Sequence, residues 1–98
     1  MKIVINAAYG GFMVTDAMLD AVGAKGRFEI VDERKYRNDP RLIAIAEQMI
    51  AENPKCKLCI MEIPDETTDW RIEECDGMEW IYYVLEGKIH SAFKDRNG

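Results

Sequence analysis

The sequence has no long apolar run and no stretch typical of a linker. None of its 98 residues belongs to an apolar segment approaching the roughly 18 residues that span a bilayer, and the apolar run within residues 1–6 is too short for a signal peptide. Ser, Gly and Pro never cluster into an internal linker. We therefore expect one domain over residues 1–93, a flexible tail at 94–98, a cytoplasmic location and no membrane partner.

Basic residues are in the minority. The chain carries 13 Lys and Arg against 18 Asp and Glu, a formal net charge of -5, and the whole excess of acid lies in residues 51–98. Duplex nucleic acid is bound mainly through Lys and Arg that neutralise phosphates, so this balance argues against duplex binding. A basic partner suits the charge better.

Cysteine and histidine are too few for a disulfide framework or a recognisable metal site. The three cysteines are an odd number without a signal sequence, so we expect free thiols. Cys56 and Cys59 have the CxxC spacing, but in a strand they point to opposite faces, and no second CxxC or histidine pair completes a zinc site. His90 is the only histidine and has no nucleophile near it in the sequence. We therefore assign no catalytic residue, metal or cofactor, and an enzyme is the least favoured function.

The residues that are present predict a small α/β domain. Hydrophobic residues make up 48% of the chain and charged residues 32%, as in ordinary globular proteins. Apolar spacing and capping residues predict a strand at 2–6 buried on both faces, a helix at 16–22 between Thr15 and Gly23, a strand at 27–31, a charged loop at 32–38, a helix from Pro40 capped by Asp39, and a buried strand at 57–63. The expected fold is a single α/β domain with a mixed β-sheet, two helices and a C-terminal β-hairpin. So short a chain buries a small core, which leaves a homo-oligomer open.

Asp76 and Gly77 predict the turn of that hairpin, because Asp-Gly favours the type I′ conformation of two-residue loops. The register follows from this turn. Ile72 faces Ile81 and Trp70 faces Tyr83 on the core side, while Arg71 faces Tyr82 and Glu73 faces Trp80 on the other. We expect residues 87–93 to add an edge strand.

A ligand site is predicted if the first three strands are parallel. The loops after these strands would then meet at one edge of the sheet, where open α/β folds bind ligands, and backbone N–H groups and cations there would favour an anion. The residues expected at this edge are Tyr9, Gly10, Gly11, Phe12, Thr15, Arg34, Lys35, Tyr36, Arg37 and Arg41. Gly10-Gly11 matches neither the Rossmann pattern nor a P-loop, so a tight turn beside a solvated basic loop is the alternative interpretation.

An acidic hairpin with aromatic residues predicts a second kind of site. Eight acids and a single base, Arg71, lie between Glu62 and Glu79. Such a surface attracts a basic protein, and exposed large aromatics commonly anchor partners unless the C-terminal segment covers them. The expected interface residues are Glu73, Glu74, Glu79, Trp80 and Tyr82. The alternative is a solvated hairpin whose charges prevent edge-to-edge aggregation.

Four segments of the chain form a recognisable pattern. They are residues 1–6 with the turn Tyr9-Gly10-Gly11-Phe12, then Arg37-x-Asp39-Pro40-x-Leu42, then Glu62-Ile63-Pro64-Asp65, and last Trp70-x-Ile72-x-Glu74-x-Asp76-Gly77-x-Glu79. The pattern resembles that of a group of small uncharacterised proteins encoded by bacteriophages and prophages. Similar proteins tend to have a cysteine before the glycine turn and a serine at the helix cap, where this chain has Ala8 and Thr15. The resemblance implies an accessory protein of a mobile element in a bacterial host, a class often devoted to countering host defences by capture or inhibition.

Two functions follow from these observations. The leading hypothesis is non-catalytic binding of a small anionic or nucleotide-like ligand, which would serve sequestration in counter-defence. The alternative is inhibition of a host or defence protein through the acidic face of the hairpin.

Overall fold

The computed structural model describes residues 1–94, which form five strands and four helices. In chain order these are β1 (Lys2–Asn6), α1 (Asp16–Val22), α2 (Arg27–Asp32), α3 (Arg34–Arg37), α4 (Pro40–Glu52), β2 (Leu58–Glu62), β3 (Asp69–Cys75), β4 (Met78–Leu85) and β5 (Lys88–Ala92). The α/β class predicted from the sequence is confirmed. The tail predicted at 94–98 lies, apart from Lys94, outside the described residues.

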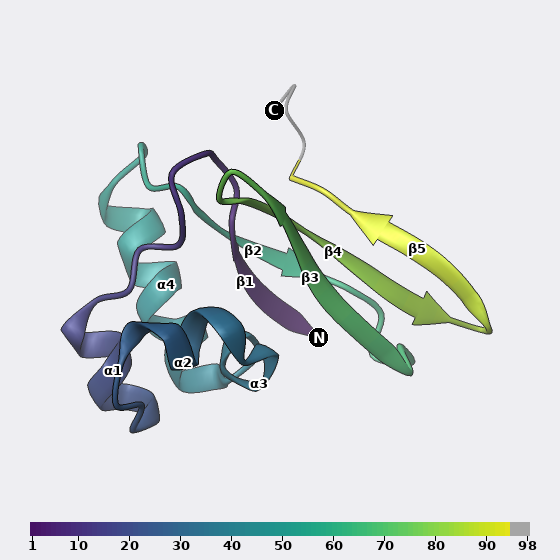
Figure 1. Ribbon diagram of the computed structural model, residues 1–98, viewed down its shortest axis with the longest axis horizontal. Helices are drawn as coiled ribbons and strands as arrows, with labels where there is room; N and C mark the ends of the chain where they lie inside the picture. The colour runs from purple at the N-terminus through teal and green to yellow at the C-terminus, as the bar shows by residue number, and fades with distance from the viewer. Residues whose placement is uncertain (95–98) are drawn as a thin grey trace.

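β1 and β2 form a two-stranded antiparallel ribbon in the middle of the molecule, between the helices and a second sheet (Figure 1). Successive side chains of a strand point to opposite faces. Val4 therefore packs with Met18 on the helical side, while Ile3 and Ile5 pack with Ile81 of β4 on the other side. The side chains of Ile3, Val4 and Ile5 are fully buried. The prediction of a strand at 2–6 buried on both faces is confirmed.

The second sheet has the strand order β3-β4-β5, with both pairs antiparallel. The β3–β4 hairpin has the predicted register, in which Ile72 lies opposite Ile81. Its turn residues Asp76 (φ 51°) and Gly77 (φ 88°) both have positive φ, as a type I′ turn requires. β5 confirms the edge strand expected within residues 87–93.

The predicted strand at 27–31 is wrong, because residues 27–32 form helix α2. Part of the predicted charged loop is helical as well, since it contains α3. An alternation of five residues is too short to distinguish a strand from one and a half turns of helix. In the helix Ile30 is fully buried against the core while Phe28 remains 68% exposed. Tertiary contacts on a single face thus decided the conformation.

Parallel pairing of the first strands is also wrong, because every strand pair among the described residues is antiparallel. The connection from β1 to β2 contains four helices, and a connection of that length permits either direction. Loops that follow two antiparallel strands lie at opposite ends of the ribbon. The single ligand edge expected from parallel strands therefore does not form.

Both predicted helices are capped by the predicted residues. The Thr15 hydroxyl accepts a hydrogen bond from Met18 N (3.2 Å), and Gly23 ends α1 in the left-handed conformation (φ 70°). Asp39 Oδ1 accepts a hydrogen bond from Arg41 N (2.9 Å) at the start of α4. These side chains satisfy backbone groups that have no partner inside a helix.

Removing the α4 cap is expected to lower the free energy of unfolding by about 1 kcal/mol. Asp39→Ala loses the bond to the Arg41 amide, whereas Asp39→Asn keeps an acceptor and is the matched control. The Arg41 guanidinium hydrogen-bonds the carboxylate and holds the pKa of Asp39 below its ordinary value. Its charge-dependent contribution is therefore present above the ordinary Asp pKa and lost as pH falls through the lowered value. Urea unfolding at neutral and acid pH measures both effects. If Asp39→Ala and Asp39→Asn lose the same free energy of unfolding at neutral pH, the capping role of Asp39 is contradicted.

Candidate functional site

The four cations predicted to line a ligand site are all ion-paired. Arg34 pairs with Asp69 (2.7 Å), Lys35 with Glu33 (3.3 Å), Arg37 with Glu79 (2.8 Å) and Arg41 with Asp39 (2.8 Å). None of the four lines the groove beside the Gly10-Gly11 turn. The expected pocket shared by this turn and the basic segment therefore does not form.

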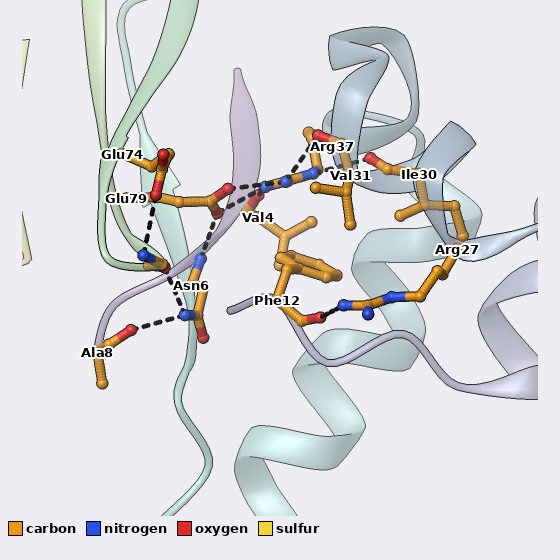
Figure 2. A network of polar contacts seen from close by, with 11 residues as sticks. Val4, Asn6, Ala8, Phe12, Arg27, Ile30, Val31, Arg37, Glu74 and Glu79 are labelled. Atoms are coloured by element: carbon orange, nitrogen blue, oxygen red, sulfur yellow. Dashed lines mark hydrogen bonds and ion pairs between the residues drawn. The ribbon is translucent and has the colours of Figure 1, made fainter. Parts of the chain in front are cut away.

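Arg37 is a structural residue at the centre of a network of polar contacts (Figure 2). Its side chain is fully buried, and all five guanidinium N–H groups have an acceptor. Nε donates to Ile30 O, one terminal nitrogen donates to Val4 O and Glu79 Oε1, and the other donates to Val31 O and Glu79 Oε2. No N–H group is left for a ligand, so the predicted ligand role of Arg37 is wrong.

Glu79 completes this network. The acidic-interface hypothesis placed this residue on the hairpin surface, but it is buried. The residue is 8% exposed, and its Oε1 also accepts a hydrogen bond from Asn6 N (2.7 Å). Arg37 meanwhile satisfies carbonyls in the last turn of α2, which have no partner inside the helix. The Arg37–Glu79 pair thus joins α2, α3, β1 and β4 (Figure 2).

A groove of about 720 Å³ opens beside the Gly10-Gly11 turn. It lies between the loop after β1, the start of α2, the end of α4 and the segment that leads into β2. We call this cavity the glycine groove. Its lining residues are Asn6, Gly10, Gly11, Phe12, Met13, Val14, Arg27, Met49, Glu52, Asn53, Lys55, Cys56, Lys57 and Leu58. Its volume is in the range of small-molecule sites.

The glycine turn that forms one wall of this groove packs directly on the hairpin turn. Gly10 (φ 109°) and Gly11 (φ 82°) have positive φ values that glycine adopts without strain. Gly10 N donates to Asp76 O (3.1 Å), and a Cβ added to Gly77 would lie 2.1 Å from Gly11 N. The tight-turn interpretation of Gly10-Gly11 therefore agrees with the geometry, and the same turn shapes the groove.

Three cations give the rim of the groove a positive charge. Arg27, Lys55 and Lys57 are exposed, and none of them forms an ion pair with another residue of the described chain. Lys57 and Arg27 donate to backbone carbonyls of the loop after β1, at 3.1 and 3.2 Å, which leaves their charges uncompensated. Among the described residues that line the groove, Glu52 is the one carboxylate. The rim therefore favours an anion.

The floor of the groove is apolar apart from one hydrogen-bond acceptor without a partner. Phe12 and Leu58 belong to the core on the helical side. Asn6 is fully buried, and its Nδ2 donates to Ala8 O (2.6 Å) and Gly77 O (2.7 Å). Its Oδ1 has no hydrogen-bond partner within residues 1–94, and Figure 2 shows this oxygen turned away from Ala8. A buried acceptor without a hydrogen-bond partner raises the free energy of the folded state.

Comparison with known protein families, curated proteins and solved structures finds no match. Among residues 1–94, no helix combines the length and the apolar character needed to cross a membrane.

The structure brings only part of the predicted ligand set to the groove. Gly10, Gly11 and Phe12 line it. Outside the lining, Tyr9 is exposed on the same loop, Thr15 caps α1, and Tyr36 is half-buried with its hydroxyl 3.5 Å from Glu29.

Sequence reasoning missed Arg27, Lys55 and Lys57. The two lysines lie just before β2, and the antiparallel pairing of Asn6 with Leu58 brings them beside the glycine turn. Only a correct prediction of that pairing could have identified them. Arg27 lies in the segment that the sequence predicts as a strand, whereas its position at the start of α2 places it at the groove.

The hairpin surface presents fewer unpaired acids and less exposed aromatic surface to a protein partner than its composition indicates. Within residues 1–94, four of its eight acids are ion-paired, namely Asp65, Asp69, Glu73 and Glu79. Trp80 stacks on Phe93 of the C-terminal segment at 5.7 Å, so this segment covers it in part. Glu74, Trp80 and Tyr82 remain on or near the surface, whereas Glu79 does not.

All three cysteines are free thiols, as predicted. Cys56 packs on the helical side of the ribbon and Cys59 on the side of the second sheet, which confirms their opposite orientation. Burial raises the pKa of the Cys59 thiol above its ordinary value. His90 is exposed on β5, stacks on Tyr83 at 5.2 Å and does not line the glycine groove.

Proposed function

We propose that the protein binds a small anionic, nucleotide-like ligand in the glycine groove without catalysing a reaction on it. The observation that carries this proposal is the set of three rim cations that have no ion-pair partner among the described residues, beside a groove of about 720 Å³. An anionic group can lie among Arg27, Lys55 and Lys57 while an uncharged body occupies the apolar floor. Sequestration of such a ligand is the use that the resemblance to mobile-element accessory proteins favours.

The lining residues support binding better than catalysis. Cys56 is the one thiol among them, and no histidine lines the groove with it. A nucleophile normally needs an adjacent base and a group that orients the base. What the groove offers instead is charge, hydrogen bonds and apolar surface, which are the elements of a binding site.

Thermal-shift measurements with phosphate, pyrophosphate and nucleoside mono-, di- and triphosphates test this proposal. At a ligand concentration about tenfold above Kd, binding stabilises the native state by about 1.4 kcal/mol, a shift in Tm of roughly 6–11 °C for a domain of this size. Lys55→Gln/Lys57→Gln is expected to weaken binding by roughly tenfold or more, since each lysine can make a charge-assisted hydrogen bond. Lys25→Gln/Lys35→Gln changes the net charge equally and should bind like the wild type. The absence of a shift with every anion would contradict the proposal.

Alkylation of the cysteines locates the ligand in the same samples. Cys56 lines the groove, whereas Cys75 is exposed on the hairpin and does not line it. A saturating ligand should slow the reaction of Cys56 with iodoacetamide and leave that of Cys75 unchanged, as followed by mass spectrometry. Protection of Cys75 alone, or of neither thiol, would place the ligand elsewhere.

A further inference from the structure

We infer that the ligand of the glycine groove is a nucleoside monophosphate whose base donates a hydrogen bond to Asn6 Oδ1 at the floor, while its phosphate lies at the cationic rim. The inference rests on the proposed function and names the class of ligand.

The Asn6 amide is held in one orientation by the fold. Both hydrogens of Nδ2 are used, on Ala8 O and Gly77 O. A flip of the amide would turn its oxygen toward these two carbonyl oxygens and would lose both hydrogen bonds. The backbone N–H of the same residue is also used, on Glu79 Oε1. Oδ1 is therefore a preorganised acceptor, and only a donor from outside the described chain can satisfy it.

The floor and the rim of the groove require different chemical groups. Asn6, Phe12 and Leu58 at the floor are 0%, 3% and 2% exposed, whereas the rim cations are exposed. A flat ring with an N–H donor suits the floor, because its faces contact apolar side chains while its edge reaches Oδ1. An anion at the floor would instead face a carbonyl oxygen. Inorganic phosphate alone satisfies the rim and leaves Oδ1 without a partner.

Two matched pairs of nucleotides test the inference on the wild-type protein by calorimetry. AMP is compared with purine riboside 5′-monophosphate, which has hydrogen in place of the amino group, and CMP with the 2-pyrimidinone riboside 5′-monophosphate. In at least one pair the amino-bearing nucleotide should bind roughly tenfold or more tightly, because its analogue leaves a buried acceptor unsatisfied.

Equal affinity within both pairs overturns the inference and leaves the proposed function standing. Failure of all four nucleotides to bind also overturns it, and the proposed function falls with it only if pyrophosphate and the other screened anions fail as well.

A second readout reports on Asn6 directly and needs no variant. In the labelled protein, the better-binding amino nucleotide should shift the side-chain carbonyl ¹³C resonance of Asn6, while pyrophosphate should not. Asn38, which does not line the groove, is the internal reference. An Asn6 carbonyl resonance that is unchanged at saturation would overturn the inference even if the nucleotide binds.

Discussion

Glu79→Ala is expected to lower the free energy of unfolding by about 3–5 kcal/mol, because it leaves a buried guanidinium without its counter-charge. Arg37 is 0% exposed and relies on Glu79 for two of its five hydrogen bonds. Asn6 N would lose its acceptor as well. A loss of this size is a large part of the total stability of a small domain. Urea unfolding measures it, and far-UV circular dichroism shows whether the variant is still folded at 25 °C.

Two further variants separate the charge from the packing around this pair. Glu79→Gln keeps the shape and an acceptor for Asn6 N but removes the counter-charge, so it should lose less than Glu79→Ala and still destabilise. The double variant Arg37→Met/Glu79→Met removes both charges and should be more stable than the sum of the single changes predicts. Single changes that cost less than about 1 kcal/mol would show that the pair behaves as an exposed ion pair does, which contradicts its burial.

Gly77→Ala is expected to cost about 2–5 kcal/mol, since two penalties add. At φ 88° an L side chain is strained, which costs about 1–2 kcal/mol. The new Cβ would also lie 2.1 Å from Gly11 N, and a clash with backbone requires a shift that costs about 1–3 kcal/mol more. Urea unfolding of the variant measures the sum.

Gly87 supplies a matched control for this change. It has a similar backbone conformation (φ 77°), but a Cβ there would meet nothing within 4 Å. Gly87→Ala should therefore show the conformational penalty alone, about 1–2 kcal/mol. If both substitutions cost the same, the close contact between the hairpin turn and the glycine turn is contradicted. Because this contact shapes one wall of the groove, Gly77→Ala should also weaken ligand binding, whereas Gly87→Ala should not.

The helix caps and the hairpin could be predicted because each depends on residues close together in the sequence. Thr15, Gly23 and Asp39 act within one turn of their helices. Asp76 and Gly77 select a two-residue turn, and the turn then determines which residues of β3 and β4 lie opposite each other. Errors arose where local preference was weak, as in residues 27–32, whose short alternation fits a strand or a helix.

The candidate site was predicted only in part, because its residues come from segments far apart in the chain. Gly10 and Gly11 were identified from their type, since a pair of glycines after a buried strand indicates a turn with positive φ. The functional assignment of Arg37 was wrong because nothing in the sequence shows that Glu79, in a different layer, buries and neutralises it. Lys55 and Lys57 were missed because their place beside the glycine turn depends on the direction in which β2 pairs with β1.

By itself the amino-acid sequence determined the positions of the capped helices, the hairpin register, the free thiols and the burial of both faces of β1, since short-range geometry and apolar patterning carry that information. The tertiary structure alone decided the antiparallel ribbon, the burial of Arg37 against Glu79 and the gathering of the rim cations around Asn6. The ribbon and the Arg37–Glu79 pair depend on contacts between residues more than 40 positions apart, and Arg27 reaches the loop after β1 across 15 positions. The free energy of such contacts becomes available only when the layers pack together.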